Sequence, residues 1–321
     1  MNGSITISGK DTFPSSKGLF QERWDIFKRN RIAYGSFWSL ISMFVLAFFG
    51  KIFTQYIIIF DPKIVRLSEK FLPPLTIFTS TTTPKEEGPA LGVYLFGTDE
   101  LGRDVFARML EGTSVSLSVG FVAIGIMLTV GIFFGGIAGY YGRVKLGFIT
   151  VDTIIMRFVD IMLCFPTFFL ILTVVALLPP SIYNIMIVIG LTSWMGTARF
   201  VRAEFLSLRI SILLLLLEVR LFLNGVLYLF IWFPMPLHLF WFPQLWVWHR
   251  PFPTESALSF LGFGVQPPDA TWGNILSDGK NFLFDAPWLT FIPGITILLV
   301  VLAFNLCGEG LREAFNPKLK T

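Results

Sequence analysis

The chain has 321 residues, of which 54% are hydrophobic and 14% are charged, and its mean hydropathy is +0.70. Soluble domains carry roughly 25% charged residues, so this composition excludes an ordinary water-exposed globular protein. The formal net charge of +4 is spread over several loops, which excludes the concentrated basic face of a nucleic-acid-binding protein.

The chain begins with a polar, basic stretch that runs into a long apolar segment. Residues 1–31 form a tail rich in Lys and Arg, and a first membrane span is predicted from about Ile32 to Ile59. A crossing needs roughly 20 apolar residues, and a backbone in lipid must satisfy its own hydrogen bonds, which favours helices. The segment is too long for a signal peptide, and no small-residue cleavage site follows it.

Further apolar runs predict further spans. Residues 60–112 are mixed in composition, contain several prolines and are predicted to lie outside the membrane, ending in a lead-in helix. Residues 113–308 form a membrane core, and residues 309–321 form a second polar tail. The predicted core spans are about Ser114–Tyr140, Val151–Leu178, Ile182–Phe200 and Pro287–Cys307.

Basic residues predict the orientation of the spans. Lys and Arg gather in both tails and after the second and fourth spans, whereas residues 255–287 carry one base, Lys280. Because Lys and Arg are enriched on the cytoplasmic side, both termini are predicted inside, with 60–112 and 255–286 outside. An even number of spans is then required, which predicts another between residues 210 and 254. The predicted fold is an all-α polytopic membrane protein with about six helices, N-in and C-in.

No cofactor or metal site is predicted. The two histidines, His238 and His249, lack further ligands at metal-binding spacing. The two cysteines, Cys164 and Cys307, lie in apolar runs and are expected to be small buried hydrophobes rather than a disulfide or redox pair.

Three glycines recur at every fourth position of the second span: Gly131, Gly135 and Gly139. They share one stripe of a helix and let another backbone approach closely. General close packing in a multispan protein and a functional interface both account for this stripe.

Three longer stretches carry specific motifs. Residues 97–120 read GTDELGRDVFARMLEGTSVSLSVG, residues 255–276 read ESALSFLGFGVQPPDATWGNIL, and residues 304–319 read FNLCGEGLREAFNPKL. They closely resemble the permease subunits of dipeptide, oligopeptide and nickel ABC importers. The resemblance covers about residues 20–209 and 255–319, in order and with similar spacing.

The resemblance implies a membrane-spanning permease subunit of the bacterial inner membrane, which moves peptides or a related small solute using ATP hydrolysed by partners. The implied partners are a paralogous permease subunit, two cytoplasmic ATPase subunits and an extracytoplasmic solute-binding protein. The chain contains no GxxxxGK[ST] phosphate-binding loop, so it is predicted not to be an enzyme.

The candidate site residues come from the first two motifs. They are Gly97, Thr98, Asp99, Gly102, Arg103, Asp104, Trp272, Gly273 and Asn274. Thr98 or Asp99 is expected to be the N-cap of the helix that leads into the second span. Two interpretations remain for the loop around Trp272: contact with the binding protein, and packing over the helix ends.

A charged pair in the third span is a further candidate. Arg157 and Asp160 are three residues apart and can share a helix face. One interpretation places them on the translocation pathway, and the other makes them an ion pair that orients the cytoplasmic end of the helix.

One segment departs from the resemblance. The family couples to its ATPase through a cytoplasmic loop with a Glu-Ala-Ala…Gly motif and a Leu-Pro-Asn turn, which should follow Arg209. Residues 210–254 lack both and hold four of the nine tryptophans. If the codons from Trp232 onward are read in a shifted frame, the genetic code allows them to encode VPNAPASILVSATLGVASA. This string resembles the expected turn and the start of the fifth span.

A pair of compensating frameshifts is the hypothesis that accounts for this resemblance, and a genuinely divergent loop is the alternative. The position of the first frameshift is not located.

Two rival functions remain. A secondary transporter would need its own coupling-ion site at broken helices near the midplane, and no paired half-helices with buried acids are evident. The other rival is a non-functional, frameshifted relic of the permease. The sequence assigns neither the transported solute nor the residues that line a pore.

Overall fold

The computed structural model describes residues 19–56, 61–78, 88–89, 92–218 and 251–315, and these are predominantly helical, as predicted. The elements in chain order are α1 (Leu19–Arg29), α2 (Arg31–Tyr56), η2 (Leu67–Glu69), β1 (Thr76–Ile77), β2 (Val93–Tyr94), α3 (Val105–Tyr140), β3 (Lys145–Leu146), β4 (Ile149–Thr150), α4 (Val151–Cys164), α5 (Thr167–Leu177), α6 (Ile182–Glu218), α9 (Pro251–Phe260), α10 (Trp272–Gly279), η5 (Lys280–Phe282) and α11 (Trp288–Phe315). The short strands pair antiparallel, β1 with β2 and β3 with β4.

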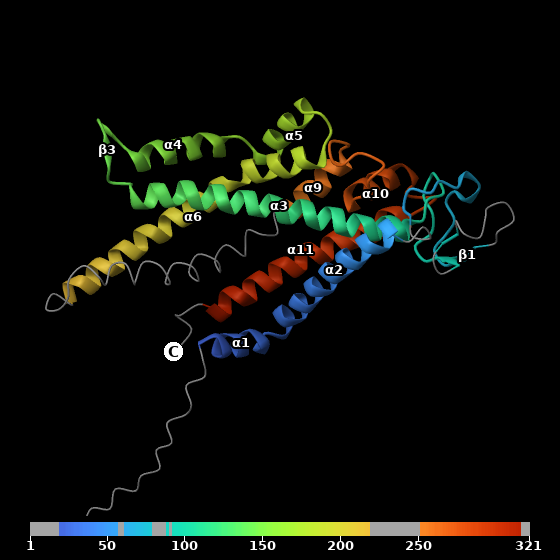
Figure 1. The fold of residues 1–321 in the computed structure, drawn as a ribbon, viewed down its shortest axis with the longest axis horizontal. Helices are drawn as coiled ribbons and strands as arrows, with labels where there is room; N and C mark the ends of the chain where they lie inside the picture. The colour runs from blue at the N-terminus through green and yellow to red at the C-terminus, as the bar shows by residue number, and fades with distance from the viewer. Residues whose placement is uncertain (1–18, 57–60, 79–87, 90–91, 219–250, 316–321) are drawn as a thin grey trace, which may run out of the picture.

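Helix α3 lies at the centre of the bundle (Figure 1). It packs along α6 and against α2, and α2 in turn packs along α11. The β1–β2 hairpin and α10 lie at one end of the bundle, whereas α1 and the β3–β4 hairpin lie toward the other end. The segments predicted to be extracytoplasmic and cytoplasmic are therefore separated along the long axis of the molecule.

Four helices in the described residues are long and apolar enough to cross a membrane: Arg31–Thr54, Val105–Tyr140, Ile182–Ser207 and Trp288–Phe315. Each matches a predicted span, although α3, α6 and α11 extend beyond the predicted ends. The lead-in helix is therefore the first part of α3 itself. The span predicted between residues 210 and 254 falls mostly outside the described residues, as do the frame-shifted string and both histidines.

The predicted third span is not one continuous helix. It is broken into α4 and α5, which meet at an angle of 83°. Pro166 has no N–H to donate, and the residue before a proline is disfavoured in the helical region. Phe165 accordingly adopts an extended backbone, with φ −85° and ψ 130°. Together the two helices provide a fifth candidate span.

The glycine stripe of α3 faces α6 of the same chain. A Cβ atom on Gly131 would lie 2.6 Å from Thr197 Cβ, and one on Gly135 would lie 2.8 Å from Val201 Cβ. Only glycine permits this approach, so the stripe packs closely against α6 of the same chain.

The cysteines differ from each other. Both are free, but only Cys307 is buried, whereas Cys164 at the end of α4 is exposed. The prediction that both are buried was therefore wrong for Cys164, which lies on α4, a helix with one buried residue, Val159.

Large apolar side chains cover much of the outside of the bundle. The exposed fraction is 66% for Phe48 on α2, 62% for Phe121 on α3 and 63% for Leu298 on α11. Soluble monomers rarely expose apolar surface on this scale. This exterior suits lipid tails or an apolar partner surface.

Candidate functional site

The first motif folds into a closed turn before α3 begins. Thr98 and Asp104 pair as an antiparallel bridge, and Gly97 and Gly102 take positive φ values of 77° and 72°. A Cβ on Gly102 would collide with the carbonyl oxygen of Arg66. Glycine is required here both for its conformation and for the space it leaves.

The N-cap of α3 is Asp104, so the prediction of Thr98 or Asp99 was wrong. Asp104 Oδ1 accepts a hydrogen bond from Phe106 N at 2.9 Å. Burial raises the pKa of the Asp104 carboxyl to about 6. The helix begins only at Val105 because the residues between Thr98 and Asp104 form the turn through Gly102. In this turn the Asp99 side chain is buried.

Asp99 is completely buried and accepts hydrogen bonds from two guanidinium groups. Its Oδ2 lies 2.6 Å from Arg103 Nε and 2.7 Å from Arg108 Nη1. Its Oδ1 accepts from the backbone N–H groups of Leu101 and Arg103, both at 2.9 Å. Charge-assisted hydrogen bonds therefore satisfy both oxygens of this carboxylate.

Helix α10 brings a second carboxylate to the same place. Asp278 Oδ2 lies 3.0 Å from Arg108 Nη2 and 3.6 Å from Arg103 Nη2. We call Asp99, Arg103, Arg108 and Asp278 the charge quartet; it has two charges of each sign and joins the motif turn to α3 and α10. The sequence reasoning singled out neither Arg108 nor Asp278, although Arg108 lies within the first motif and Asp278 lies two residues after the second.

In the second motif, the residues at the start of α10 are buried against α3. Trp272 is 1% exposed; its Nε1 lies 3.3 Å from Thr113 Oγ1, and its backbone N lies 3.3 Å from Ser116 Oγ. Thr271 and Asn274 form a reciprocal capping box at the start of α10, with distances of 3.1 and 2.9 Å. Gly273 lies against α9, since a Cβ there would be 2.5 Å from Ser259 Cβ. In the described structure these residues pack within the chain, and contact of the loop with a binding protein stays a prediction.

Thr98 connects the first motif to the rest of this end of the bundle. Its hydroxyl accepts from Leu72 N at 2.8 Å and donates to Glu69 O, and its carbonyl accepts from Trp288 Nε1 at 3.2 Å. The segment before the motif and the start of α11 are therefore fixed to one buried residue.

The third-span pair is arranged differently from the prediction. Asp160 of α4 forms an ion pair with Arg199 of α6, and in the described part of the chain no ion pair joins it to Arg157. Arg157 is exposed. Asp152 pairs with Arg202 in the same way, with Oδ2 2.6 Å from Nη2. The acids of α4 thus link it to the facing helix rather than to the next turn.

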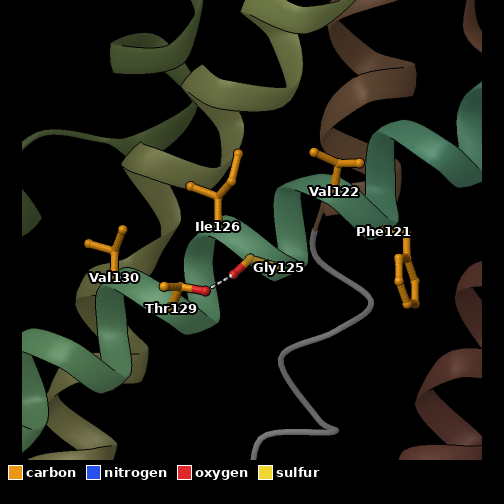
Figure 2. A pocket seen from close by; sticks show the side chains of 6 residues that line it. All are labelled: Phe121, Val122, Gly125, Ile126, Thr129 and Val130. Carbon is orange, nitrogen blue, oxygen red and sulfur yellow. Dashed lines mark hydrogen bonds between the residues drawn. The ribbon is translucent and has the colours of Figure 1, made fainter.

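A shallow groove runs along α3 (Figure 2). It is lined by side chains of that helix alone: Phe121, Val122, Gly125, Ile126, Thr129 and Val130. Its one hydroxyl, on Thr129, donates to Gly125 O at 2.8 Å. Among the residues that the structure describes, the lining of this groove is therefore almost entirely apolar.

The apolar helices, the broken span and the buried charges at one end define a polytopic helical membrane protein. Its sequence matches the family described as the binding-protein-dependent transport system inner membrane component over residues 131–321, and the chain belongs to this family. Residues 18–74 match the N-terminal transmembrane domain of oligopeptide transport permease C. These matches confirm the predicted family resemblance.

Curated relatives extend the similarity over nearly the whole chain. A dipeptide transport system permease protein of Haemophilus influenzae is 36% identical over 315 residues, 95% of this chain and 96% of that protein. One of Alkalihalophilus pseudofirmus is 38% identical over 254 residues, 78% of this chain and 81% of that protein. An oligopeptide transport system permease protein of Bacillus subtilis is 27% identical over 318 residues, 95% and 92% of the two chains.

Proposed function

We propose that this chain is the permease subunit of an ABC importer that moves peptides, or a related small solute, across the bacterial inner membrane. The similarity to a dipeptide permease along 95% of the chain carries the proposal. The first two motifs, which closely resemble the family's permeases, support it because the structure packs them together through the ion pair of Arg108 with Asp278 and the hydrogen bond of Trp272 with Thr113.

The energy for transport comes from partners. We propose two cytoplasmic ATPase subunits, a paralogous permease subunit and an extracytoplasmic solute-binding protein, assembled around this chain in the bilayer. The permease changes access between two states when ATP binding and hydrolysis in the partners favour one state over the other.

The domain limits proposed for this role are those predicted from the sequence. Residues 1–31 and 309–321 form cytoplasmic tails, and residues 32–59 form the first span. Residues 60–112 form the outer segment, and residues 113–308 form the permease core.

We expect the purified chain to show no ATP hydrolysis by itself, because it carries no phosphate-binding loop. ATP hydrolysis and peptide uptake should both arise in vesicles when all partner subunits are present. Both are measured with and without this chain in otherwise complete vesicles. Hydrolysis by the chain alone would refute the assignment to a permease, and ion-driven uptake without the partners would identify a secondary transporter.

We expect both termini to face the cytoplasm. The β3–β4 hairpin, which contains Lys145, lies at the end of the bundle opposite the β1–β2 hairpin, which supports opposite sides for the two (Figure 1). Paired reporter fusions, one active only in the cytoplasm and one only outside it, should place residues 145 and 318 inside and residue 77 outside. An external location for residue 145 or 318 would reverse the proposed topology.

A further inference from the structure

Two carboxyl groups are completely buried in the described part of the chain, Asp99 and Glu255, and only Asp99 has cationic partners. Glu255 lies on α9, where Ser259 Oγ donates to its Oε1 at 2.8 Å and Ser256 Oγ lies 3.4 Å from its Oε2. Two further hydroxyls belong to the same cluster: Thr271 Oγ1, at the start of α10, lies 3.5 Å from Ser259 Oγ, and Ser116 Oγ of α3 lies 3.3 Å from the backbone N of Trp272. Glu255 is thus surrounded by hydroxyl groups from three elements.

The ionisable groups of the neighbouring elements have other partners. Glu111 of α3 accepts from Ala270 N at 3.1 Å, and Asp278 of α10 pairs with Arg108. Among the residues that the structure describes, no lysine, arginine or histidine forms an ion pair with Glu255. An ionised carboxylate buried without a cation is very unfavourable, whereas a neutral carboxylic acid with hydroxyl partners is not.

We propose that Glu255 is a positioning residue that works in its protonated, neutral form. Its acid O–H donates one hydrogen bond and its other oxygen lone pairs accept from the surrounding hydroxyls, which donate and accept in turn. Burial raises the pKa of Glu255, in agreement with this state.

The hydroxyls around Glu255 also hold the second motif. Ser116 Oγ lies 3.3 Å from the backbone N of Trp272, and Thr271 Oγ1 caps Asn274 N at 3.1 Å. A substitution of Glu255 should therefore shift α10. This helix carries Trp272 and also Asp278, which belongs to the charge quartet. Glu255 sets how α9 and α10 lie on α3, whichever partners the chain assembles with.

Infrared spectroscopy of the purified full-length chain in lipid tests the protonation state. The difference between wild type and Glu255→Gln at neutral pH should show the loss of the C=O stretching band of a protonated carboxylic acid. The loss of a carboxylate band instead, or a band that shifts when sodium ions are added, would overturn the proposal and indicate a bound cation.

Thermal unfolding of the same proteins tests the positioning role. Glu255→Gln keeps the size and the neutral donor and should unfold within a degree or two of wild type. Glu255→Ala leaves the hydroxyls without partners and should lower Tm by about 5 °C. Glu309→Gln, at a carboxyl that is 59% exposed, serves as the matched control and should change nothing. A Gln variant as unstable as the Ala variant would show that the ionised form is needed. Neither measurement depends on transport, so a failure of this proposal can be distinguished from a failure of the proposed function.

Discussion

Replacing Asp99 with alanine is expected to destabilise the folded chain by about 3–5 kcal/mol, because it leaves buried guanidinium groups without their common carboxylate. Arg103 and Arg108 have only 10% and 3% of their side-chain surface exposed, so water cannot replace the lost partner. Asp278 remains and is 27% exposed, but it holds the guanidinium groups from one side only. Unfolding of the purified protein in a denaturing detergent, followed by circular dichroism, measures the change.

The same end of the bundle provides a matched control. Lys63 and Asp269 form an ion pair of 3.2 Å, but their side chains are 45% and 50% exposed. Exposed pairs contribute roughly 0–1 kcal/mol, so Asp269→Ala should unfold almost like wild type. Equal effects of Asp99→Ala and Asp269→Ala would show that the quartet does not stabilise this end of the bundle.

Hydropathy and motif order were enough to predict most of the framework. The four apolar helices fall on predicted spans because a bilayer allows few alternatives to a long apolar helix. The break between α4 and α5 could have been predicted from Pro166 as well, since proline restricts the residue before it. The prediction missed this break because the residues on both sides of Pro166 are apolar and were interpreted as one continuous span.

The contacts at the site were much less predictable. Arg157 and Asp160 are neighbours in sequence, yet Asp160 pairs with Arg199 of another helix. Arg108 and Asp278 are separated by 170 residues, and only the packing of α10 on α3 brings them together. Periodicity indicates which face a side chain lies on, but the choice among partners depends on tertiary distances that it does not contain.

The other large expected effect concerns uptake and the segment 210–254. The chain as written should not support transport, whereas a version with this segment restored to the other reading frame should. The reason is chemical. An ATPase drives a permease through a short cytoplasmic helix that docks into it, and such a helix needs polar, charged and small residues that face water and the partner.

Residues 210–254 supply only three charges, Glu218, Arg220 and Arg250, among Leu, Phe and Trp. Each large apolar side chain left in water costs roughly 1.5–3 kcal/mol relative to burial. A segment of this composition should enter the bilayer or misfold rather than form a docking loop. The structure describes helix at both ends of this segment: α6 continues into it as far as Glu218, and α9 begins within it at Pro251, with Phe252 stacked on Phe304 of α11.

Uptake of a labelled dipeptide decides between the two versions. Cells that lack their own permease subunit receive either the chain as written or the restored chain, with all partner subunits present and equal amounts of each chain in the membrane. The restored chain should give uptake well above the empty-vector level, and the chain as written should remain at that level. Equal uptake by the two would show that 210–254 is a tolerated variant of the coupling segment.

Determining the nucleotide sequence across codons 205–256 then locates the first shift point or shows that there is none.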